Sequence, residues 1–274
     1  MNLFIASISA LATIAAAIIY YYTLNEIKKQ RENTYKPHLF IDNIYFYVQS
    51  MKKGELMFPS IWSNESKDVT KIFEFSNKHL GLSDFGLKCF NIGFGTAKNV
   101  NISFAYDIDI FIDQINQLNK YVSPELLIIV KKEFGLISLK CENKDIPYPN
   151  KIISIDNCLS SYLSYILPVN VKNEHSTVKL PLHFLELLNV YVFLFSSISE
   201  KEENNFELNI PLITAEIKYQ DISNRQFSIK MKIVTKFTML STSGYVGEFK
   251  INEYNSDEIK PQMDNSSFIE DFFN

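Results

Sequence analysis

The chain has 274 residues, of which 46% are hydrophobic and 14% aromatic, and its formal net charge at pH 7 is −4. This composition can fill a sizeable core, which excludes a wholly disordered chain, and the acidic balance argues against a nucleic-acid binder. The three cysteines, Cys89, Cys141 and Cys158, show no C-x-x-C spacing. We therefore expect free, reduced thiols and no disulfide framework.

The first predicted element is an apolar run, residues 3–22, that carries no charged side chain. About twenty helical residues cross a hydrocarbon layer roughly 30 Å thick, so residues 1–36 are predicted to form a transmembrane and juxtamembrane helix. A cleaved signal peptide is disfavoured, because no Lys or Arg precedes the run and the run continues past Ala15–Ala17.

The residues that follow this run predict its orientation. Basic side chains close to a helix end place that side in the cytoplasm, and tyrosines suit the headgroup layer. We expect a single-pass protein of the inner (cytoplasmic) membrane, with its N-terminus outside and its soluble domain in the cytoplasm. The predicted lipid-interface residues are Tyr20, Tyr21, Tyr22, Lys28, Lys29 and Arg31.

Small residues share one face of the predicted membrane helix: Ala6, Ala10, Thr13 and Ala17 follow one another at steps of four, three and four. Small faces let helices approach closely in lipid. The pattern is compatible with self-association, with a partner helix, and with a chance alignment in an Ala-rich span.

A β-rich cytoplasmic domain is predicted over residues 37–254, beginning where Pro37 ends the helix. In a strand–turn–strand unit over 86–108, Gly93 and Gly95 are expected to supply positive φ. Asp109 is expected to cap a helix over 111–118, and Pro124 to open a second helix over 124–134. Other strands are expected at 38–49, near 55–62, at 71–78, 134–141 and 151–157, and near 165–171.

Later in the chain, a helix over 181–195 is apolar nearly all round, apart from a stripe of His183, Glu186 and Asn189 that we expect to face solvent. Alternation over 213–219 and 227–237 predicts an antiparallel hairpin closed by the turn DISNR. The predicted fold class is mainly β with helical insertions (α+β), arranged as an antiparallel β-sandwich for which the immunoglobulin topology is one candidate.

Three segments carry a resemblance: the juxtamembrane residues Glu26–Arg31, the pattern Y-x-P-x-L at Tyr35–Leu39, and N-I-G-x-G-x-A-x-N-V at Asn91–Val100. A weaker match lies in the hairpin near Tyr219. Together they resemble a broad group of uncharacterised bacterial single-pass membrane proteins. The resemblance implies a cytosolic β-domain on a membrane anchor and no catalytic residues. Some members of that group resemble accessory or effector proteins of phage defence.

Three residue patterns bear on whether the chain carries a chemical site. Gly93 and Gly95 are followed by a predicted strand and lack G-K-[ST], so a turn is favoured over a phosphate loop. Asp107, Asp109 and Asp113 have no His or Cys partner nearby, which favours helix capping over a metal site. The chain also lacks G-x-S-x-G and H-E-x-x-H. We therefore predict a protein that is not an enzyme and needs no cofactor or metal.

Two surfaces could contact partners. The lysines Lys218, Lys230, Lys232 and Lys236 lie on the outer face of the predicted hairpin, where they either approach anionic lipid or form an ordinary solvated face. The acidic tail, residues 255–274, ends in an apolar helical face that either packs on its own domain or docks into a partner. That face consists of Phe268, Ile269, Phe272 and Phe273.

The sequence thus predicts a non-enzymatic, membrane-anchored interaction or scaffold module that contacts membrane lipid and a protein partner or a second copy of itself. The alternative is a membrane effector whose domain senses a small-molecule ligand, such as a nucleotide second messenger, and whose helices then assemble to perturb the membrane.

Overall fold

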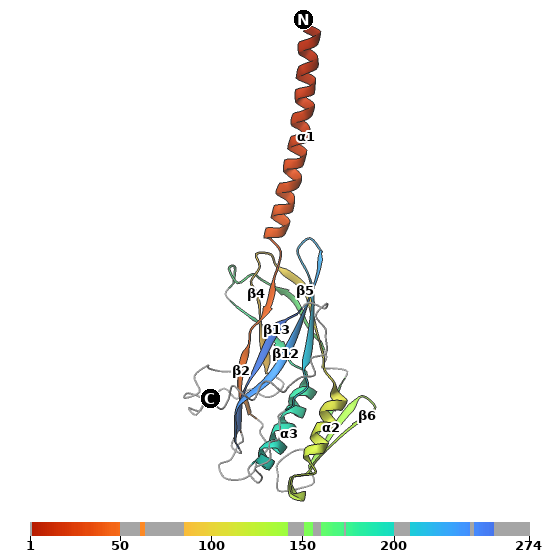
Figure 1. Cartoon of the computed structure of the whole chain (residues 1–274), viewed down its shortest axis with the longest axis vertical. Coiled ribbons are helices and arrows are strands. Elements are labelled where there is room, and N and C mark those ends of the chain that lie inside the picture. Colours follow the sequence, from red (N-terminus) through yellow and green to blue (C-terminus); the bar gives the residue numbers. More distant parts are fainter. Residues whose placement is uncertain are drawn as a thin grey trace.

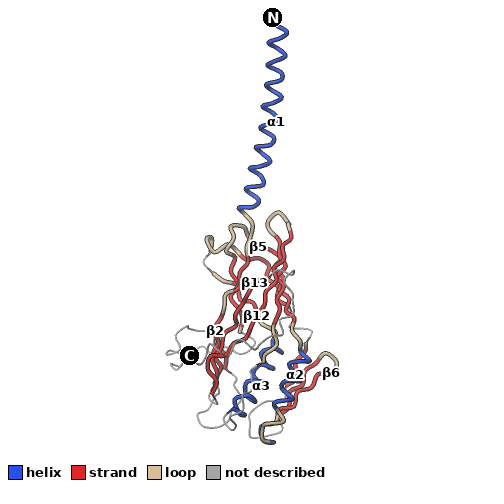
Figure 2. Tube along the Cα trace, in the orientation of Figure 1, coloured by secondary structure: helices blue, strands red, loops and turns tan. Residues whose placement is uncertain are grey.

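The computed structural model describes residues 2–49, 61–63, 85–141, 151–155, 160–172, 174–199, 209–241 and 244–254. The described chain is mainly antiparallel β-sheet with a few helices, as predicted (Figures 1 and 2). A long N-terminal helix stands away from the β-rich body. The predicted strand at 71–78 and the tail 255–274 lie outside the described residues.

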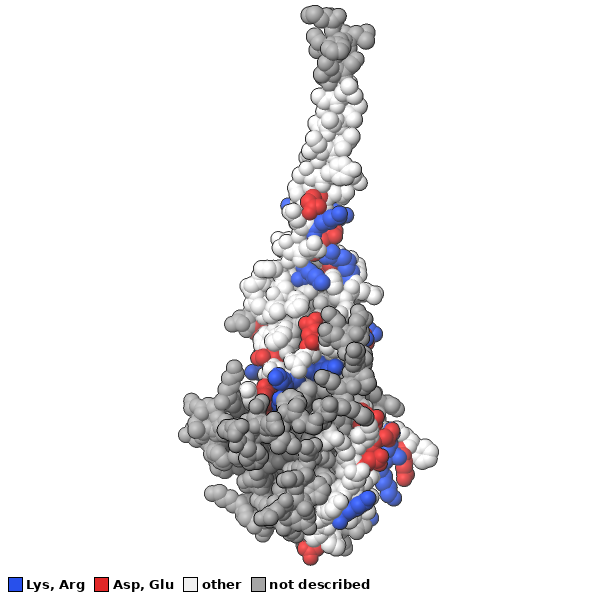
Figure 3. All heavy atoms as spheres, viewed as in Figure 1, with Lys and Arg blue, Asp and Glu red and all other residues white. Residues whose placement is uncertain are grey.

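Helix α1 (Asn2–Thr34) contains 33 residues and at 1.5 Å per residue is about 50 Å long. It ends at Thr34, shortly before Pro37, where the sequence predicted the end. Its part Ala10–Thr34 has the length and composition to cross a membrane and is not buried against the rest of the chain. On the face that Figure 3 draws, the charged side chains of α1 lie on its part nearest the body.

A seven-stranded antiparallel sheet forms the framework of the body. The strands, in their order across the sheet, are β3 (Ile61–Ser63), β2 (Ile44–Gln49), β13 (Gly244–Glu253), β12 (Gln226–Ser241), β11 (Ile213–Gln220), β5 (Ala97–Ala105) and β9 (Ser160–Ile166). The predicted hairpin is confirmed as β11 and β12, with Ile213 opposite Ile233 and Gln220 opposite Gln226. Its inward side chains, such as Ile217 and Ile233, are fully buried.

A second sheet has the order β1 (Leu39–Ile41), β4 (Gly86–Asn91) and β10 (Ser176–Lys179). The strand predicted over 38–49 is therefore two strands in two sheets. Asp42 and Asn43 separate them, because the amide of Asp42 bonds to Lys88 O and the Asn43 side chain accepts from Ile251 N. The strands of the predicted unit at 86–108 both exist, but β4 and β5 also belong to different sheets.

A third sheet contains β6 (Ile128–Glu133), β7 (Leu136–Cys141) and β8 (Lys151–Ser154). The helix predicted over 124–134 is wrong: only Pro124–Leu126 forms a 3-10 turn, and β6 follows. The β-branched run Ile128–Val130 favours a strand, and Ile128 and Val130 are buried on one face of it. The strand predicted near 165–171 is misplaced: β9 covers Ser160–Ile166, and residues 169–171 form a turn.

Helix α2 (Ile108–Leu118) begins at Asp107, whose carboxylate accepts a hydrogen bond from Ile110 N at 3.0 Å. The prediction that Asp109 caps this helix is therefore wrong, because the cap lies two residues earlier. Asp109 lies in the first turn, where both of its carboxylate oxygens accept from Lys132 Nζ of β6 at 2.8 Å. This ion pair attaches the third sheet to α2.

Helix α3 (Leu182–Ser199) is confirmed near its predicted position and is buried along both its apolar and its polar faces. The prediction that its polar stripe faces solvent is wrong, because His183 and Asn189 are fully buried and Glu186 is 3% exposed. Glu186 bonds to Lys151 of β8, and Asn189 bonds to Trp62 of β3 and Tyr245 of β13. The stripe faces inward because strands of the third sheet and of the seven-stranded sheet cover it.

Candidate functional site at the helix–domain junction

The strongest candidate site is the place where α1 meets the β-domain. We call it the junction and define it as Glu32–His38, Asn91–Gly95 and the hairpin segment Tyr219–Arg225. Two patterns that carried the resemblance, Y-x-P-x-L and N-I-G-x-G, meet here, and so does the hairpin near Tyr219. Residues that are distant in the sequence therefore form one structural unit.

Asn91 is the central polar residue of the junction and is fully buried. Its Oδ1 accepts from the amides of His38 and Gly93, each at 3.1 Å. Its Nδ2 donates to Gly95 O at 2.7 Å and to Ile166 O at 3.0 Å. The amide group thus uses both of its donors and two acceptor positions. It fastens the chain leaving α1 to the 91–95 turn and to β9.

Gly93 and Gly95 permit the backbone of the chain leaving α1 to approach. A Cβ at Gly93 would lie 2.5 Å from His38 N, and one at Gly95 would overlap the carbonyl oxygen of Tyr35. The predicted role in supplying positive φ is wrong, because in the described chain Gly135 is the glycine with a positive φ. Close backbone contact is the reason that glycine is needed at both positions.

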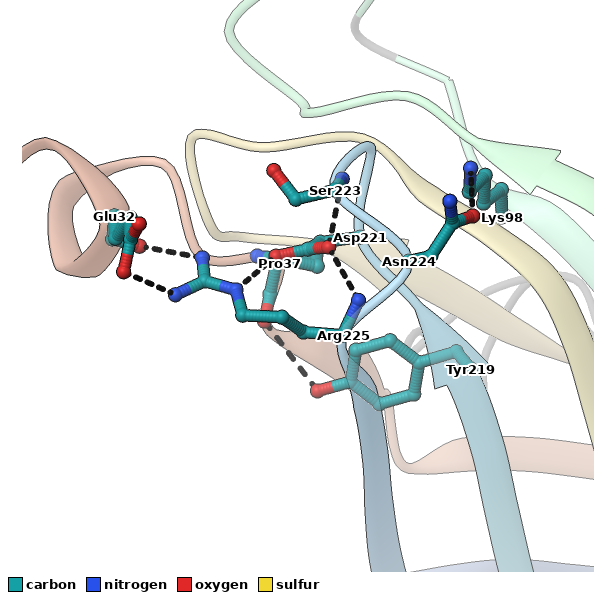
Figure 4. A network of polar contacts seen from close by, with 8 residues as sticks. All are labelled: Glu32, Pro37, Lys98, Tyr219, Asp221, Ser223, Asn224 and Arg225. Atoms are coloured by element: carbon teal, nitrogen blue, oxygen red, sulfur yellow. Dashed lines mark hydrogen bonds and ion pairs between the residues drawn. The ribbon is translucent and has the colours of Figure 1, made fainter.

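Tyr219 binds Pro37 in the segment that leaves α1, as Figure 4 shows. Its hydroxyl donates to Pro37 O at 3.3 Å, and burial raises its pKa to about 12 with a smaller contribution from the charge of Glu253. The Tyr219 ring stacks on Phe227, and Lys36 Nζ lies 5.1 Å from the centre of the Phe227 ring. The hydroxyl therefore stays protonated and donates at any physiological pH.

Arg225 joins the hairpin tip directly to α1 (Figure 4). Its Nη2 donates to Glu32 O at 2.9 Å and its Nη1 lies 3.3 Å from Glu32 Oε2. Its Nε donates to Asp221 Oδ2 at 2.6 Å. Glu32 O is a carbonyl in the last turn of the helix, where it lacks a helical partner. Arg225 thus satisfies the helix end and pairs with the hairpin turn.

Asp221 organises that turn and is 1% exposed. Its Oδ1 accepts from the amides of Ser223 and Arg225, at 2.8 and 2.9 Å. Burial by itself would raise the pKa of Asp221, but the hydrogen bonds and charge of Arg225 and the Ser223 amide outweigh burial and lower it. The carboxylate is therefore ionised when it holds Arg225 against α1.

The predicted membrane residues lie along α1. Ala10, Thr13 and Ala17 are exposed, so this face is open in the single chain; Ala6 is helical, and its side chain is outside the description. Tyr20, Tyr21 and Tyr22 are 66%, 63% and 67% exposed. Lys28, Lys29 and Arg31 are also exposed and lie between these tyrosines and the junction. The aromatic docking motif Phe268, Ile269, Phe272 and Phe273 lies outside the described residues.

A second candidate site is the buried polar stripe of α3. Glu186 Oε1 accepts from Lys151 Nζ at 2.6 Å, and Asn189 Oδ1 accepts from Trp62 Nε1 at 3.1 Å and from the Tyr245 hydroxyl. The His183 ring stacks on Tyr106, with centroids 5.4 Å apart, and neither of its nitrogens has a hydrogen-bond partner among the described residues. Burial lowers the pKa of His183 to about 4, so the imidazole is neutral.

The outer face of the hairpin carries its lysines as predicted, but part of their charge is locally compensated. Lys218 Nζ lies 3.1 Å from Glu216 Oε2, and Lys232 Nζ lies 4.8 Å from the centre of the Tyr254 ring. The Lys218 hydrogen bond is the largest cause of the lowered pKa of Glu216. This face is therefore a mixed polar surface and a weaker candidate for lipid contact than its lysines alone suggested.

Sequence reasoning missed Glu32, Tyr219, Asp221 and Arg225 as junction residues, and it treated Asn91 only as part of a turn motif. One available signal was the turn DISNR, since the side chain of an Asp that opens a turn often accepts a hydrogen bond from the backbone amide two residues on. The pairing with Glu32 has no local signal. No protein-family model, curated protein or solved structure matches this chain.

Proposed function

We propose that the chain is a membrane-anchored, non-enzymatic interaction module whose cytoplasmic β-domain binds a protein partner. The observation that carries the proposal is the junction. Asn91, Tyr219 and Arg225 bind the end of α1 and the residues after it with four hydrogen bonds or ion pairs. A loose tether would suffice to keep a domain near a membrane, so a fixed connection supports a role in which the pose of the domain matters.

The proposed orientation is N-out and C-in across the inner membrane. It is supported by Lys28, Lys29 and Arg31, which follow the apolar run on the side of the β-domain. An immunoglobulin-like β-sandwich remains our proposal for the domain. A role as an accessory component of a bacterial defence system is proposed from the resemblance of Tyr35–Leu39 and Asn91–Val100.

The direct test is chemical crosslinking of the full-length protein in native membranes, followed by purification and mass spectrometry. A second protein in stoichiometric amount, recovered by the wild type and not by a chain that lacks residues 37–254, supports the interaction module. Recovery of self-crosslinks alone would contradict it and favour a homo-oligomeric effector.

The effector is a second candidate, because the same rigid junction could transmit a change from the domain to α1. A flexible Gly-Ser insertion between Thr34 and Tyr35 separates the two functions. An interaction module keeps the intrinsic affinity of its domain for the partner after the insertion and loses only the fixed pose in which the partner is held, whereas an effector loses ligand-dependent damage to the membrane potential. Replacing Ala10 and Thr13 by Leu should then reduce helix assembly in detergent, and an unchanged particle size would exclude assembly through this face.

A further inference from the structure

Phe134 stands at the tip of the β6–β7 hairpin with its side chain fully exposed, at 101% of the reference area. It forms a two-residue turn with Gly135, closed by the pair Glu133 and Leu136. Phe134 has φ 51° and Gly135 has φ 74°. Positive φ at both positions defines a type I′ turn, which strongly favours Asn-Gly.

An aromatic residue is unfavourable at this position for two independent reasons. A bulky side chain with positive φ is strained, because its Cβ crowds the following carbonyl. An exposed phenyl ring also gains nothing from burial. The other non-glycine residues with positive φ in the described chain are Asn99 and Asn224, a residue type that tolerates this conformation. Strain and exposure at the same residue point to a role outside the folding of this chain.

The hairpin tip is held in place, so the ring is presented by a firm support. Ile155 N donates to Gly135 O at 2.9 Å. Further back, the Asn119 side chain bonds to both the carbonyl and the amide of Ile128, at 2.7 and 3.3 Å. The Lys132–Asp109 ion pair fixes β6 to α2. An aromatic anchor that is already ordered loses little conformational entropy on binding.

Phe134 is continuous with an exposed apolar area on the outer face of the third sheet. Leu136 is 41% exposed and Ile152 is 74% exposed. Ser138 lies opposite Ile152, and Leu136 opposite Ser154, so Leu136 and Ile152 are diagonal neighbours on one face. We call Phe134, Leu136 and Ile152 the hairpin-tip patch.

Charges beside the hairpin-tip patch are mostly positive. Lys131 lies opposite Ser138 and Glu133 opposite Leu136, while Ile129 lies opposite Lys140. The outward charged residues of β6 and β7 are therefore Lys131, Lys140 and Glu133, all of them exposed. This arrangement complements a pocket with an apolar floor and an acidic rim. Two copies of the patch meeting face to face would instead bring lysines together.

We propose that the hairpin-tip patch docks a cytosolic protein through an apolar pocket bordered by carboxylates, with Phe134 as the anchor. Figure 1 places β6 at the end of the body remote from α1, so this surface lies far from the bilayer that α1 would cross. The inference rests on the proposed function, since it names the surface through which the module would bind its partner.

The test uses a photo-reactive phenylalanine analogue at position 134 of the full-length protein in native membranes. A matched probe at Tyr165 on β9, which is 62% exposed, serves as the control. We expect one discrete crosslink to another protein from position 134 and none from 165. That protein is then purified, and its affinity is measured for wild-type chain, Phe134→Asn and Lys131→Glu.

Phe134→Asn is expected to weaken binding at least tenfold, because an aromatic anchor that becomes buried in the partner's pocket contributes most of the energy of such contacts. The same variant should unfold at an equal or higher temperature, since Asn accepts positive φ. Lys131→Glu should also weaken binding, and its loss of affinity relative to wild type should be larger at low salt than at high salt, because salt screens exposed charges. A lower unfolding temperature for Phe134→Asn with unchanged affinity would show that Phe134 has only a structural role.

The outcomes separate this inference from the proposed function. A stoichiometric partner that crosslinks from 165 and not from 134 overturns the inference and leaves the interaction module standing. Crosslinks from 134 to lipid or to a second copy of the chain also overturn it. Recovery of no partner from any position overturns both.

Discussion

Arg225 and Glu32 are 193 positions apart in the chain, yet the guanidinium of one donates to the main-chain carbonyl and approaches the carboxylate of the other. One side chain thereby connects the tip of the β11–β12 hairpin to the last turn of α1. Because Arg225 also pairs with the buried Asp221, movement of the helix end would disturb the hairpin turn.

Replacing Arg225 by Ala should lower the free energy of unfolding by about 2 kcal/mol, because it leaves a buried carboxylate without its partner. Trp62 is the single tryptophan and is fully buried, so its fluorescence during urea unfolding of the full-length protein in detergent provides the measurement. Lys98→Ala removes an exposed hydrogen bond to Asn224 and should change stability by less than about 0.5 kcal/mol. Equal effects of the two variants would contradict our account of Arg225.

Replacing Gly95 by Ala should destabilise the protein by about 1–3 kcal/mol, the usual range for overpacking. The added methyl would overlap Tyr35 O, so the exit from α1 must shift. Without that contact, the same change would be neutral or stabilising. Phe94→Ala, between the two glycines at a side chain that is 62% exposed, is the control and should have little effect. Thermal unfolding followed by circular dichroism distinguishes them.

Replacing Asn189 by Leu should lower the free energy of unfolding by about 2–5 kcal/mol. The change keeps the number and branching of the side-chain heavy atoms but leaves the Trp62 and Tyr245 donors buried without an acceptor. Ser197→Ala is a suitable control on the same helix, because the Ser197 hydroxyl bonds to Phe193 O one turn back and so within α3 itself. A urea midpoint for Asn189→Leu like that of the control would contradict the buried location of the stripe.

The stability of the protein should fall as the pH falls from about 6.5 toward 4, through His183. Burial holds its folded pKa at about 4, below the ordinary 6.5, so the unfolded chain binds a proton that the folded chain rejects. The stabilisation is complete above pH 6.5, and at pH 5 the loss is about 2 kcal/mol. His183→Phe, which can still stack on Tyr106, should remove this component. The measurement is the difference in urea midpoint between pH 7 and pH 5 for both proteins.

Elements with a strong local pattern were predictable from sequence. Period-two alternation located β11 and β12, and continuous apolar runs located α1 and α3. Predictions failed where tertiary contacts decide between local options. The run Ile128–Val130 suits a helix or a strand, and pairing with β7 selects the strand. His183, Glu186 and Asn189 look like a solvent face until Lys151, Trp62 and Tyr245 cover them.

The junction was predictable only in its parts. Pro37, Gly93 and Gly95 were recognised as positions of special backbone geometry, but the reason for the glycines is the carbonyl of Tyr35 and the amide of His38, which no local window includes. Glu32 and Arg225 have no sequence feature that pairs them. Such contacts depend on the order of strands in the sheets, and a single sequence does not specify that order.

Because α1 is one unbroken helix as far as Thr34, the number of residues between the apolar run and the junction determines how the β-domain is rotated about the axis of α1, and so which way it faces in the plane of the bilayer. Each helical residue turns the chain by about 100°. One inserted alanine near Ile27, upstream of the junction, would therefore rotate the domain by roughly that angle, while seven would restore its orientation to within about 20° and move it about 10 Å further from the apolar run. Neighbouring copies or partners in the same bilayer would meet a domain that always faces the same way relative to its anchor.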